Sequence, residues 1–243
     1  MSFDSQLEQY EEKHATKVIF INHKENKSIF GTSYESLGER DAQAFVDIMR
    51  TIDPNTHITL VLKTRGGSMT SAEIIVHALL LHPGKVSVYI PYVCMSAGTI
   101  IALTADEIHM DPNAYCGPID PQFFGISVTD VIKFCQRYSD SNTWVGDLAK
   151  LISGQAESAM ERIRSVLRQD KSRSETTLAT IDAELISGKY NHDKPLFPQD
   201  MQEITPNVIA SIPTDLMELY QAFINRKDSN GSPISQMLGN FGL

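Results

Sequence analysis

Apolar strands alternate with amphipathic helices through the first half of this chain, and this alternation limits the folds open to it. Short β-rich runs at 17–22, 58–62 and 86–90 are separated by segments whose apolar residues recur at helical spacing. Strands and helices in this order build βαβ units, in which the strands lie parallel and the helices cover the sheet. We therefore expect an α/β fold with a parallel sheet.

The second half of the chain has a different pattern. From residue 126 on, the stretches 143–169 and 174–187 each carry one apolar face, which predicts two consecutive amphipathic helices without an intervening strand. A further helix is expected over 213–223, and a Gly- and Ser-rich segment follows it. We expect one domain over residues 1–225 with a helical carboxyl-terminal part, and a flexible tail over 226–243.

Charge and the length of the apolar runs exclude two classes of partner. The chain has 21 Lys and Arg against 30 Asp and Glu, a net charge of −9, and no dense basic run that would hold a nucleic-acid backbone. No apolar run approaches the roughly 18 to 20 residues that a bilayer-spanning helix needs, and the acidic residues 1–12 do not resemble a secretory signal. We expect a cytoplasmic protein with no nucleic-acid partner and no membrane anchor in this chain.

The three cysteines, Cys94, Cys116 and Cys135, are odd in number and form no Cys-x-x-Cys pair. Such a set supports neither a disulfide framework nor a zinc ribbon. We therefore expect reduced, mostly buried thiols and no metal site.

Two turns built from small residues follow buried strands. The first is Thr64-Arg65-Gly66-Gly67-Ser68, and the second is Cys94-Met95-Ser96-Ala97-Gly98-Thr99. Neither matches a phosphate-binding loop or the Gly-x-Ser-x-Gly elbow, and each taken alone could be a tight turn or a helix cap. Because the carboxyl ends of neighbouring parallel strands meet at one edge of a sheet, we expect the two turns to lie side by side where ligands bind.

Five segments on and around the second turn form longer motifs: Pro83-Gly84-Lys85-Val86, Met95-Ser96-Ala97-Gly98-Thr99, Ala105-Asp106-Glu107-Ile108, Met110-Asp111-Pro112-Asn113 and Gly117-Pro118-Ile119-Asp120-Pro121-Gln122. They resemble the serine dehydrogenase proteinase family, which is similar to signal peptide peptidase A and, more remotely, to the Clp peptidase subunit. The resemblance implies the Clp/crotonase fold, a spiral of ββα units, and serine endopeptidase activity. It implies no redox cofactor, because "dehydrogenase" refers to a protein that the family is said to degrade.

The resemblance also assigns residues. Ser96 matches the family's nucleophile, and the backbone N–H groups of Gly67 and Ala97 match the oxyanion hole of the Clp subunit. Such donors must lie about 3 Å from the developing negative charge, which the small residues at both turns allow. Extended backbone at Gly66 and Gly67 could also pair with a substrate peptide as an added strand.

The general base has several candidates. No His stands in the Gly117–Asp120 stretch, where the Clp subunit would carry it, and Ser158 stands where the family commonly has a Lys. His192 and Asp193 lie in a segment, 190–195, that resembles another family motif, and a histidine can act as a base near pH 7 without a large pKa shift.

Lys150 is a second candidate for the base. A lysine base would need its pKa lowered from about 10.4 to about 7–8, which costs about 4 kcal/mol. His109 is close to Ser96 in sequence but lies in an alternating strand. A chain with no working base is a further possibility.

The expected function is that of a serine peptidase acting on peptide or protein substrates, with no cofactor. The resemblance implies a homo-oligomer, and the helices after residue 143 offer apolar faces for it. Two alternatives stay open, a non-catalytic peptide-binding or scaffold descendant and a crotonase-like acyl-CoA enzyme. Whether a separate unfoldase delivers the substrate is left open by the sequence.

Overall fold

A five-stranded parallel sheet forms the centre of the computed structural model, which describes residues 2–28, 31–123, 126–137, 144–170 and 172–226. Its strands, in spatial order, are β1 (Thr16–Asn22), β4 (His57–Lys63), β5 (Val86–Ile90), β7 (Glu107–Met110) and β11 (Val208–Ile209). Nearly every side chain of β1, β4 and β5 is buried, as is typical of a parallel sheet with both faces covered.

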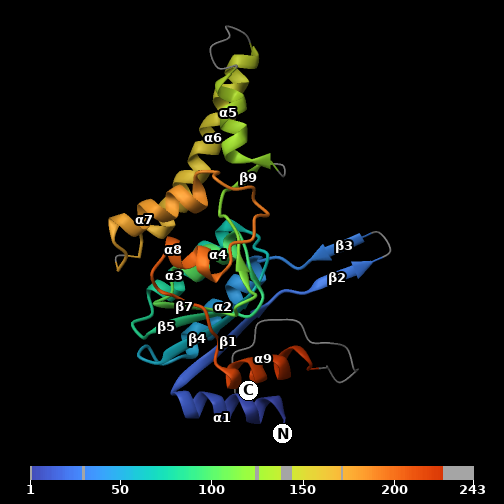
Figure 1. Cartoon of the computed structure of the whole chain (residues 1–243), viewed down its shortest axis with the longest axis vertical. Helices are drawn as coiled ribbons and strands as arrows, with labels where there is room; N and C mark the ends of the chain where they lie inside the picture. Colours follow the sequence, from blue (N-terminus) through green and yellow to red (C-terminus); the bar gives the residue numbers. More distant parts are fainter. Residues whose placement is uncertain (1, 29–30, 124–125, 138–143, 171, 227–243) are drawn as a thin grey trace.

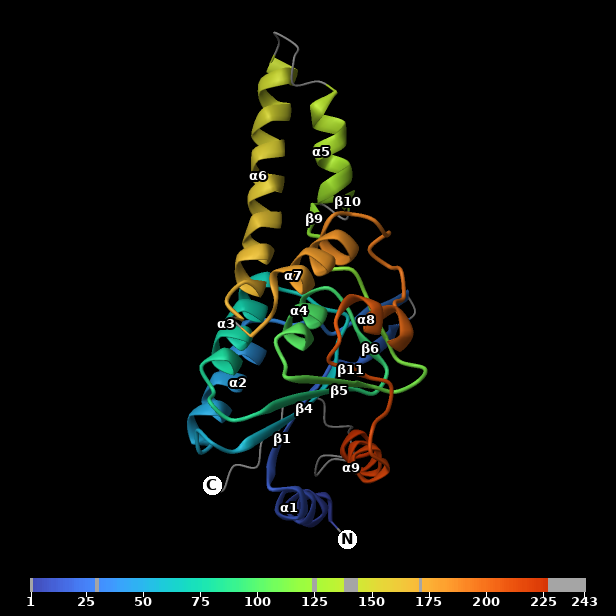
Figure 2. The same cartoon turned by 60° about the vertical axis from the view of Figure 1, so that its left-hand side comes forward.

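Helices cover both faces of this sheet, so the body of the protein has three layers (Figures 1 and 2). The main hydrophobic core lies between the sheet and α2 (Glu39–Thr51), α3 (Met69–Leu80) and α4 (Ala97–Leu103). A smaller core lies on the opposite face, under α1 (Phe3–His14) and α9 (Thr214–Ile224). In this smaller core Phe20 of β1 stacks on Phe223 of α9 with ring centroids 4.3 Å apart.

A helical hairpin projects from the body (Figures 1 and 2). It consists of α5 (Val128–Gln136) and α6 (Trp144–Leu167). The inner half of α6 buries Ala156, Met160 and Ile163 in the main core, and Arg162 Nε donates a hydrogen bond to Glu73 of α3 at 2.6 Å. The outer half of α6 therefore extends beyond the layer that α3 belongs to.

The remaining elements are short. The pair β2 (Glu25–Ser28) and β3 (Gly31–Tyr34) is antiparallel, as is the pair β9 (Gln122–Phe123) and β10 (Ile126–Ser127), whereas β6 (Val93–Cys94) and β8 (Tyr115–Cys116) pair in parallel. After α6 come α7 (Glu175–Ile181), a π-helical turn (Asp182–Ile186) and α8 (Pro198–Ile204). None of the helices in the described ranges is long and apolar enough to cross a membrane.

The α/β fold with a parallel sheet, predicted from the alternation of strands and helices, is confirmed, and so are the consecutive helices after residue 143. All three cysteines are buried and unpaired, as expected. The elements that were not predicted include the β2–β3 hairpin, the helix α5 and the edge strand β11. β11 has only two residues, too few to show an alternating pattern. Most of the predicted tail, 227–243, lies outside the described residues.

Candidate active site

The turns that follow β4 and β6 lie side by side. The Thr64 N–H donates a hydrogen bond to the carbonyl of Val93 at 2.9 Å, and the Met95 N–H donates to the carbonyl of Thr64 at 3.0 Å. Beyond this ladder the backbone of Gly66 reaches Ser96: a Cβ added to Gly66 would lie 2.9 Å from Ser96 Cβ. The adjacency that the sequence predicted for the two turns is therefore present in the fold.

Ser96 has an unusual backbone conformation. Its φ of 51° and ψ of −119° lie outside the regions that L-residues favour, and the only other non-glycine residue with positive φ in the described chain is Ala15, at the end of α1. Strain of about 1–3 kcal/mol per such residue is found mostly at functional sites. The Ser96 side chain is partly exposed, and its hydroxyl contacts no hydrogen-bond partner among the described residues.

The hydroxyl of Thr99 holds this strained turn in place. Thr99 is fully buried in the first turn of α4, and its Oγ1 lies 2.9 Å from both the carbonyl of Cys94 and the carbonyl of Gly117. One buried side chain thus links the segments before and after Ser96 to the loop that follows β8.

Two backbone N–H groups beside Ser96 are unpaired within the described part of the chain. They belong to Gly67 and to Ala97. The other edge of the first turn is occupied: the Leu37 N–H donates to the carbonyl of Gly66, and the Ser68 N–H donates to the carbonyl of Leu37, both at 2.8 Å. Because successive groups of an extended backbone face opposite sides, the N–H of Gly67 faces away from Leu37. Two free N–H donors beside a serine hydroxyl are the arrangement that an oxyanion hole would require.

Gly67 is fixed as glycine by its surroundings. Its φ is +147°, a region that L-residues rarely adopt, and an added Cβ would overlap the backbone of Leu37. Any other residue here would push the turn away from Leu37. The shape of the turn therefore depends on the absence of a side chain at position 67.

A network of polar side chains, Thr64, His23 and Asp41, supports the 64–68 turn. The Gly66 N–H donates a hydrogen bond to Thr64 Oγ1 at 3.0 Å, and His23 Nδ1 lies 2.7 Å from the same oxygen. His23 Nε2 in turn lies 3.6 Å from a carboxylate oxygen of Asp41. The Thr64 hydroxyl oxygen thus lies between the Gly66 N–H and the His23 ring, and His23 lies between Thr64 and Asp41.

This network was not among the predictions from the sequence, although the position of His23 offers a signal. His23 directly follows β1, so it lies at the same edge of the sheet as the two turns. Burial opposes ionisation of Asp41, but hydrogen bonds from His23 and from the Gly38 N–H outweigh it, and the pKa of Asp41 is lowered. Asp41 is thus held as a carboxylate facing His23.

His192 pairs with Asp120. His192 Nδ1 lies 2.8 Å from Asp120 Oδ1, and the Asp120 side chain is completely buried, whereas the His192 side chain is 31% exposed. An ionised carboxylate only accepts hydrogen bonds, so this contact places the ring proton on Nδ1 and leaves Nε2 free. Asp193 is exposed and contacts no side chain that the structure describes. The sequence-based prediction named Asp193, next to His192, and not Asp120, which lies 72 positions away.

The His192–Asp120 pair lies on segments that pack along the Ser96 turn. Leu196 and Cys116 exchange two backbone hydrogen bonds of 2.9 Å, which join the 191–196 loop to the end of β8. The next residue, Gly117, packs so closely on Met95 that an added Cβ would lie 2.9 Å from Met95 Cε. The 116–120 segment therefore connects the histidine loop to the turn that carries Ser96.

The structure does not bring Lys150 to Ser96 within one chain. Lys150 is exposed on the outer half of α6 and has no partner in the described ranges. It precedes Arg162, the residue that contacts α3, by 12 positions, or about 18 Å along a helix. Ser158, the position of the family's common Lys, is exposed, and its hydroxyl donates to the carbonyl of Gly154 at 2.8 Å.

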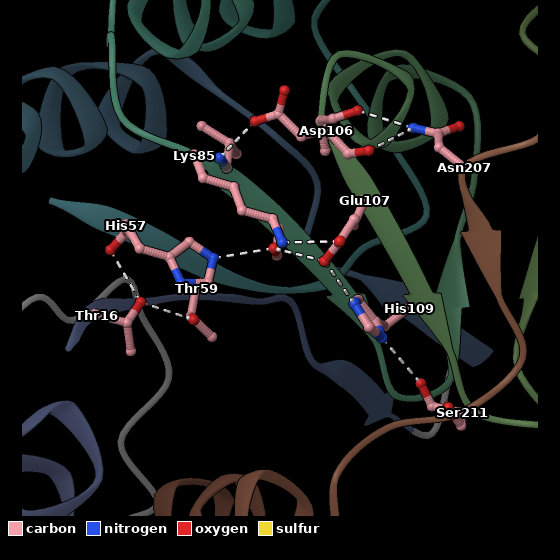
Figure 3. Close-up of polar contacts among 12 residues, drawn as sticks. Thr16, His57, Thr59, Lys85, Asp106, Glu107, His109, Asn207 and Ser211 are labelled. Atoms are coloured by element: carbon pink, nitrogen blue, oxygen red, sulfur yellow. Dashed lines mark hydrogen bonds and ion pairs between the residues drawn. The ribbon is translucent and has the colours of Figure 1, made fainter. Parts of the chain in front are cut away.

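His109 lies on the opposite face of the sheet from α4. It stacks on Tyr89 with ring centroids 4.4 Å apart. Its two ring nitrogens lie 3.3 Å from Glu107 Oε2 and from the carbonyl of Ser211 (Figure 3). Its neighbours in β7, Ile108 and Met110, face the main core beneath α4 instead. His109 is therefore part of a separate polar cluster and not of the Ser96 region.

Cys94 is a poor rival to Ser96 as nucleophile. Its side chain is fully buried, and burial, together with the neighbouring Cys116 thiol, raises the pKa of Cys94 well above its usual value. A thiol that stays protonated is unreactive. In addition, no group of three His, Cys, Asp or Glu side chains within the described ranges is arranged to hold a metal ion.

Comparison with known proteins identifies a family whose sequences are similar to this chain. The sequence model of a family described as "ClpP-like SDH-type serine proteinase" matches residues 2–235. Uncharacterized protein MJ0137 of Methanocaldococcus jannaschii is 28% identical over 224 residues, which are 88% of this chain and 77% of that protein. Uncharacterized protein MJ1495 of the same organism is 31% identical over 232 residues, 92% of this chain and 78% of that protein.

Proposed function

The chain belongs to the ClpP-like SDH-type serine proteinases, and from this premise we propose that it hydrolyses peptide bonds with Ser96 as the nucleophile. The observation that carries the proposal is the strained, partly exposed Ser96 beside two unpaired backbone N–H groups, those of Gly67 and Ala97. A nucleophile next to preformed donors is the arrangement that acyl transfer needs, and each donor contributes about 10²–10³ in rate.

In the proposed mechanism the Ser96 hydroxyl attacks the carbonyl carbon of the scissile peptide bond. The carbonyl oxygen becomes an oxyanion and accepts hydrogen bonds from the N–H groups of Gly67 and Ala97. Collapse of this intermediate expels the amine and leaves an acyl-enzyme, which water then hydrolyses to restore the hydroxyl.

His192 is the base that this mechanism uses. Its Nε2 takes the proton from the Ser96 hydroxyl and later gives it to the leaving amine. Asp120 accepts the hydrogen bond from Nδ1, holds the ring in the required tautomer, and stabilises the imidazolium that forms. The proposal is supported by the buried position of Asp120 and by the packing of residues 116–120 along the Ser96 turn.

The substrate would approach the free edge of the first turn. Since Leu37 already pairs with the backbone of Gly66 and Ser68, an extended peptide can add only on the side toward which the N–H of Gly67 points. A peptide held there would present its carbonyl to the two donors and its carbonyl carbon to Ser96.

Labelling with a serine-reactive fluorophosphonate, followed by intact-mass analysis, tests this proposal. The wild type should gain one adduct, Ser96→Ala none, and His192→Gln and Asp120→Asn should react much more slowly, whereas Lys150→Ala should react like the wild type. Labelling that survives in Ser96→Ala would remove Ser96 as the nucleophile. Equal labelling of wild type and His192→Gln would remove His192 as the base.

A further inference from the structure

Arg65 has the only long side chain of the 64–68 turn. The other residues of this turn are Thr64, Gly66, Gly67 and Ser68. Arg65 is exposed, whereas Thr64 is buried. A substrate that approaches the turn therefore meets backbone atoms, short side chains and one guanidinium group.

Arg65 also lies close to Ser96. Gly66 follows Arg65 directly, and a Cβ added to Gly66 would lie 2.9 Å from Ser96 Cβ. Because consecutive Cα atoms are about 3.8 Å apart, the Cα of Arg65 lies within about 8 Å of Ser96 Cβ, a distance that an arginine side chain can largely span. An extended peptide advances by about 3.3 Å per residue, so Arg65 can reach side chains up to about three residues from a bond held at Ser96.

The guanidinium group of Arg65 is held in place, but its charge is not neutralised. Its Cζ atom lies 4.2 Å from the centroid of the Tyr34 ring. No carboxylate pairs with Arg65, and its N–H groups contact no acceptor, within the described part of the chain. A cation–π contact consumes none of the five N–H donors of a guanidinium, so these donors are available to a carboxylate, which can accept two of them at once.

Other cations around the turn are already occupied. Lys63, two residues before Arg65, donates from Nζ to the carbonyl of His23 at 3.1 Å. Arg162, which reaches the helix after the turn, α3, donates from Nε to Glu73 at 2.6 Å. The chain as a whole has a net charge of −9. The unpaired positive charge of Arg65 is therefore a local feature of the turn beside Ser96.

We propose that Arg65 selects substrates that carry a carboxylate within about three residues of the scissile bond, and that Tyr34 positions its guanidinium for this contact. This inference rests on the proposed peptidase function, because it assigns Arg65 to the substrate of that site. The carboxylate can belong to an Asp or Glu side chain or to the free carboxyl terminus of a peptide, since both present the same two oxygen atoms. Arg65 is thus a specificity-determining residue.

Peptide binding to the Ser96→Ala variant tests this selection without relying on hydrolysis. Fluorescent peptides that differ only by Glu or Gln at one position, with an amidated carboxyl terminus, are compared by anisotropy, and the Gln peptide is also measured with a free carboxyl terminus. The dissociation constant of the Glu peptide, the free-terminus peptide or both should be about tenfold lower than that of the amidated Gln peptide, as expected for a charge-assisted hydrogen bond. The peptide that binds more tightly identifies the source of the carboxylate.

Substitutions of Arg65 in the same Ser96→Ala background decide whether this residue causes the preference. Arg65→Gln should make the dissociation constants equal, and Arg65→Glu should favour a Lys peptide over the Glu peptide. Arg50→Gln is the matched control, because Arg50 is an exposed arginine in the last turn of α2 and pairs with Asp47. The preference should persist in this control. Equal binding of all peptides before Arg65 is changed, no binding of any peptide, or a preference that persists in Arg65→Gln would overturn the proposal.

Two substitutions of Tyr34 test its positioning role. Tyr34→Phe keeps the ring and should keep the preference, whereas Tyr34→Leu removes the ring and should reduce it. Equal preferences in these two variants would overturn the role of Tyr34.

Fluorophosphonate labelling of the wild type separates this inference from the proposed hydrolysis. Preferential binding of the carboxylate peptide without labelling of Ser96 would refute the hydrolysis and leave the selection by Arg65 standing. Labelling of Ser96 with equal binding of all peptides would refute the selection alone.

Discussion

Replacing Gly66 by alanine should displace from Ser96 the 64–68 turn, which carries the Gly67 N–H proposed for the oxyanion hole. Gly66 has a φ of +101°, and an added Cβ would lie 2.9 Å from Ser96 Cβ and 2.8 Å from the carbonyl oxygen of Met95. Non-bonded carbon atoms prefer a separation of about 3.5–4.0 Å, so the turn must move away from Ser96 by about 0.6–1 Å. The N–H of Gly67 moves with it, because it is the next residue of the same turn.

Two effects of different size follow from this displacement. A positive φ costs an alanine about 1–3 kcal/mol of folding free energy, which lowers the Tm of a domain of this size by about 2–12 °C. A misplacement of about 1 Å, or the loss of one oxyanion donor, costs about 10²–10³ in rate. The reactivity of Ser96 should therefore fall far more than the stability of the fold.

The assay is the second-order rate constant of fluorophosphonate labelling, measured by intact mass at a temperature well below the Tm of each variant. Gly154→Ala is the matched control: Gly154 lies in the middle of α6, an added Cβ meets nothing within 4 Å, and the helix should gain about 0.8–1.0 kcal/mol. The Gly154→Ala variant should be labelled as fast as the wild type. If folded Gly66→Ala labels within about threefold of the wild type, the oxyanion hole is not at this turn.

Three further predictions concern the residues around the site. Thr64→Val removes the hydroxyl that accepts the Gly66 N–H hydrogen bond. It should lower the free energy of unfolding in urea by about 1–3 kcal/mol and slow labelling about tenfold. An unchanged midpoint of urea unfolding would contradict the role of the network. Asp120→Asn should slow labelling by up to about 10⁴-fold, whereas Asp193→Asn should not change it; equal effects would argue against Asp120 as the positioning residue. The pKa of Asp41 is lowered in the folded state. Its carboxylate therefore stabilises the fold at pH values above its usual pKa of 3.8, and this stabilisation is lost as the pH falls from 3.8 through the lower pKa of the folded state. Urea titrations between pH 3 and 6 should show a weaker acid dependence in Asp41→Asn.

The sequence could predict the contacts that follow from the order of strands. The turns at Gly66 and Ser96 each follow a buried strand, and in a parallel sheet such turns meet at one edge, whatever the side chains do. The adjacency of the two turns could therefore be predicted before the fold was known. The choice of Ser96 and of the Gly67 and Ala97 N–H groups within these turns came from the family resemblance.

The pairing of His192 with Asp120 could not be predicted in the same way. These residues are 72 positions apart and lie on loops, where no periodicity reports which side chains meet. Asp193 is next to His192 in sequence, but adjacent side chains of an extended segment point in different directions. The contact of His23 with Thr64 joins residues 41 apart and depends on the register of β1 against β4, which the sequence does not specify.

The stacking of Phe20 on Phe223 has a consequence for how the protein is made. The β1 strand leaves the ribosome before the helix that covers its aromatic face, because Phe223 of that helix lies 203 positions after Phe20. At about 5–20 residues per second, this surface stays open to solvent for roughly 10 to 40 s. The nascent chain therefore offers a long interval for chaperone binding, and a ribosome stalled before α9 would expose an aggregation-prone sheet face.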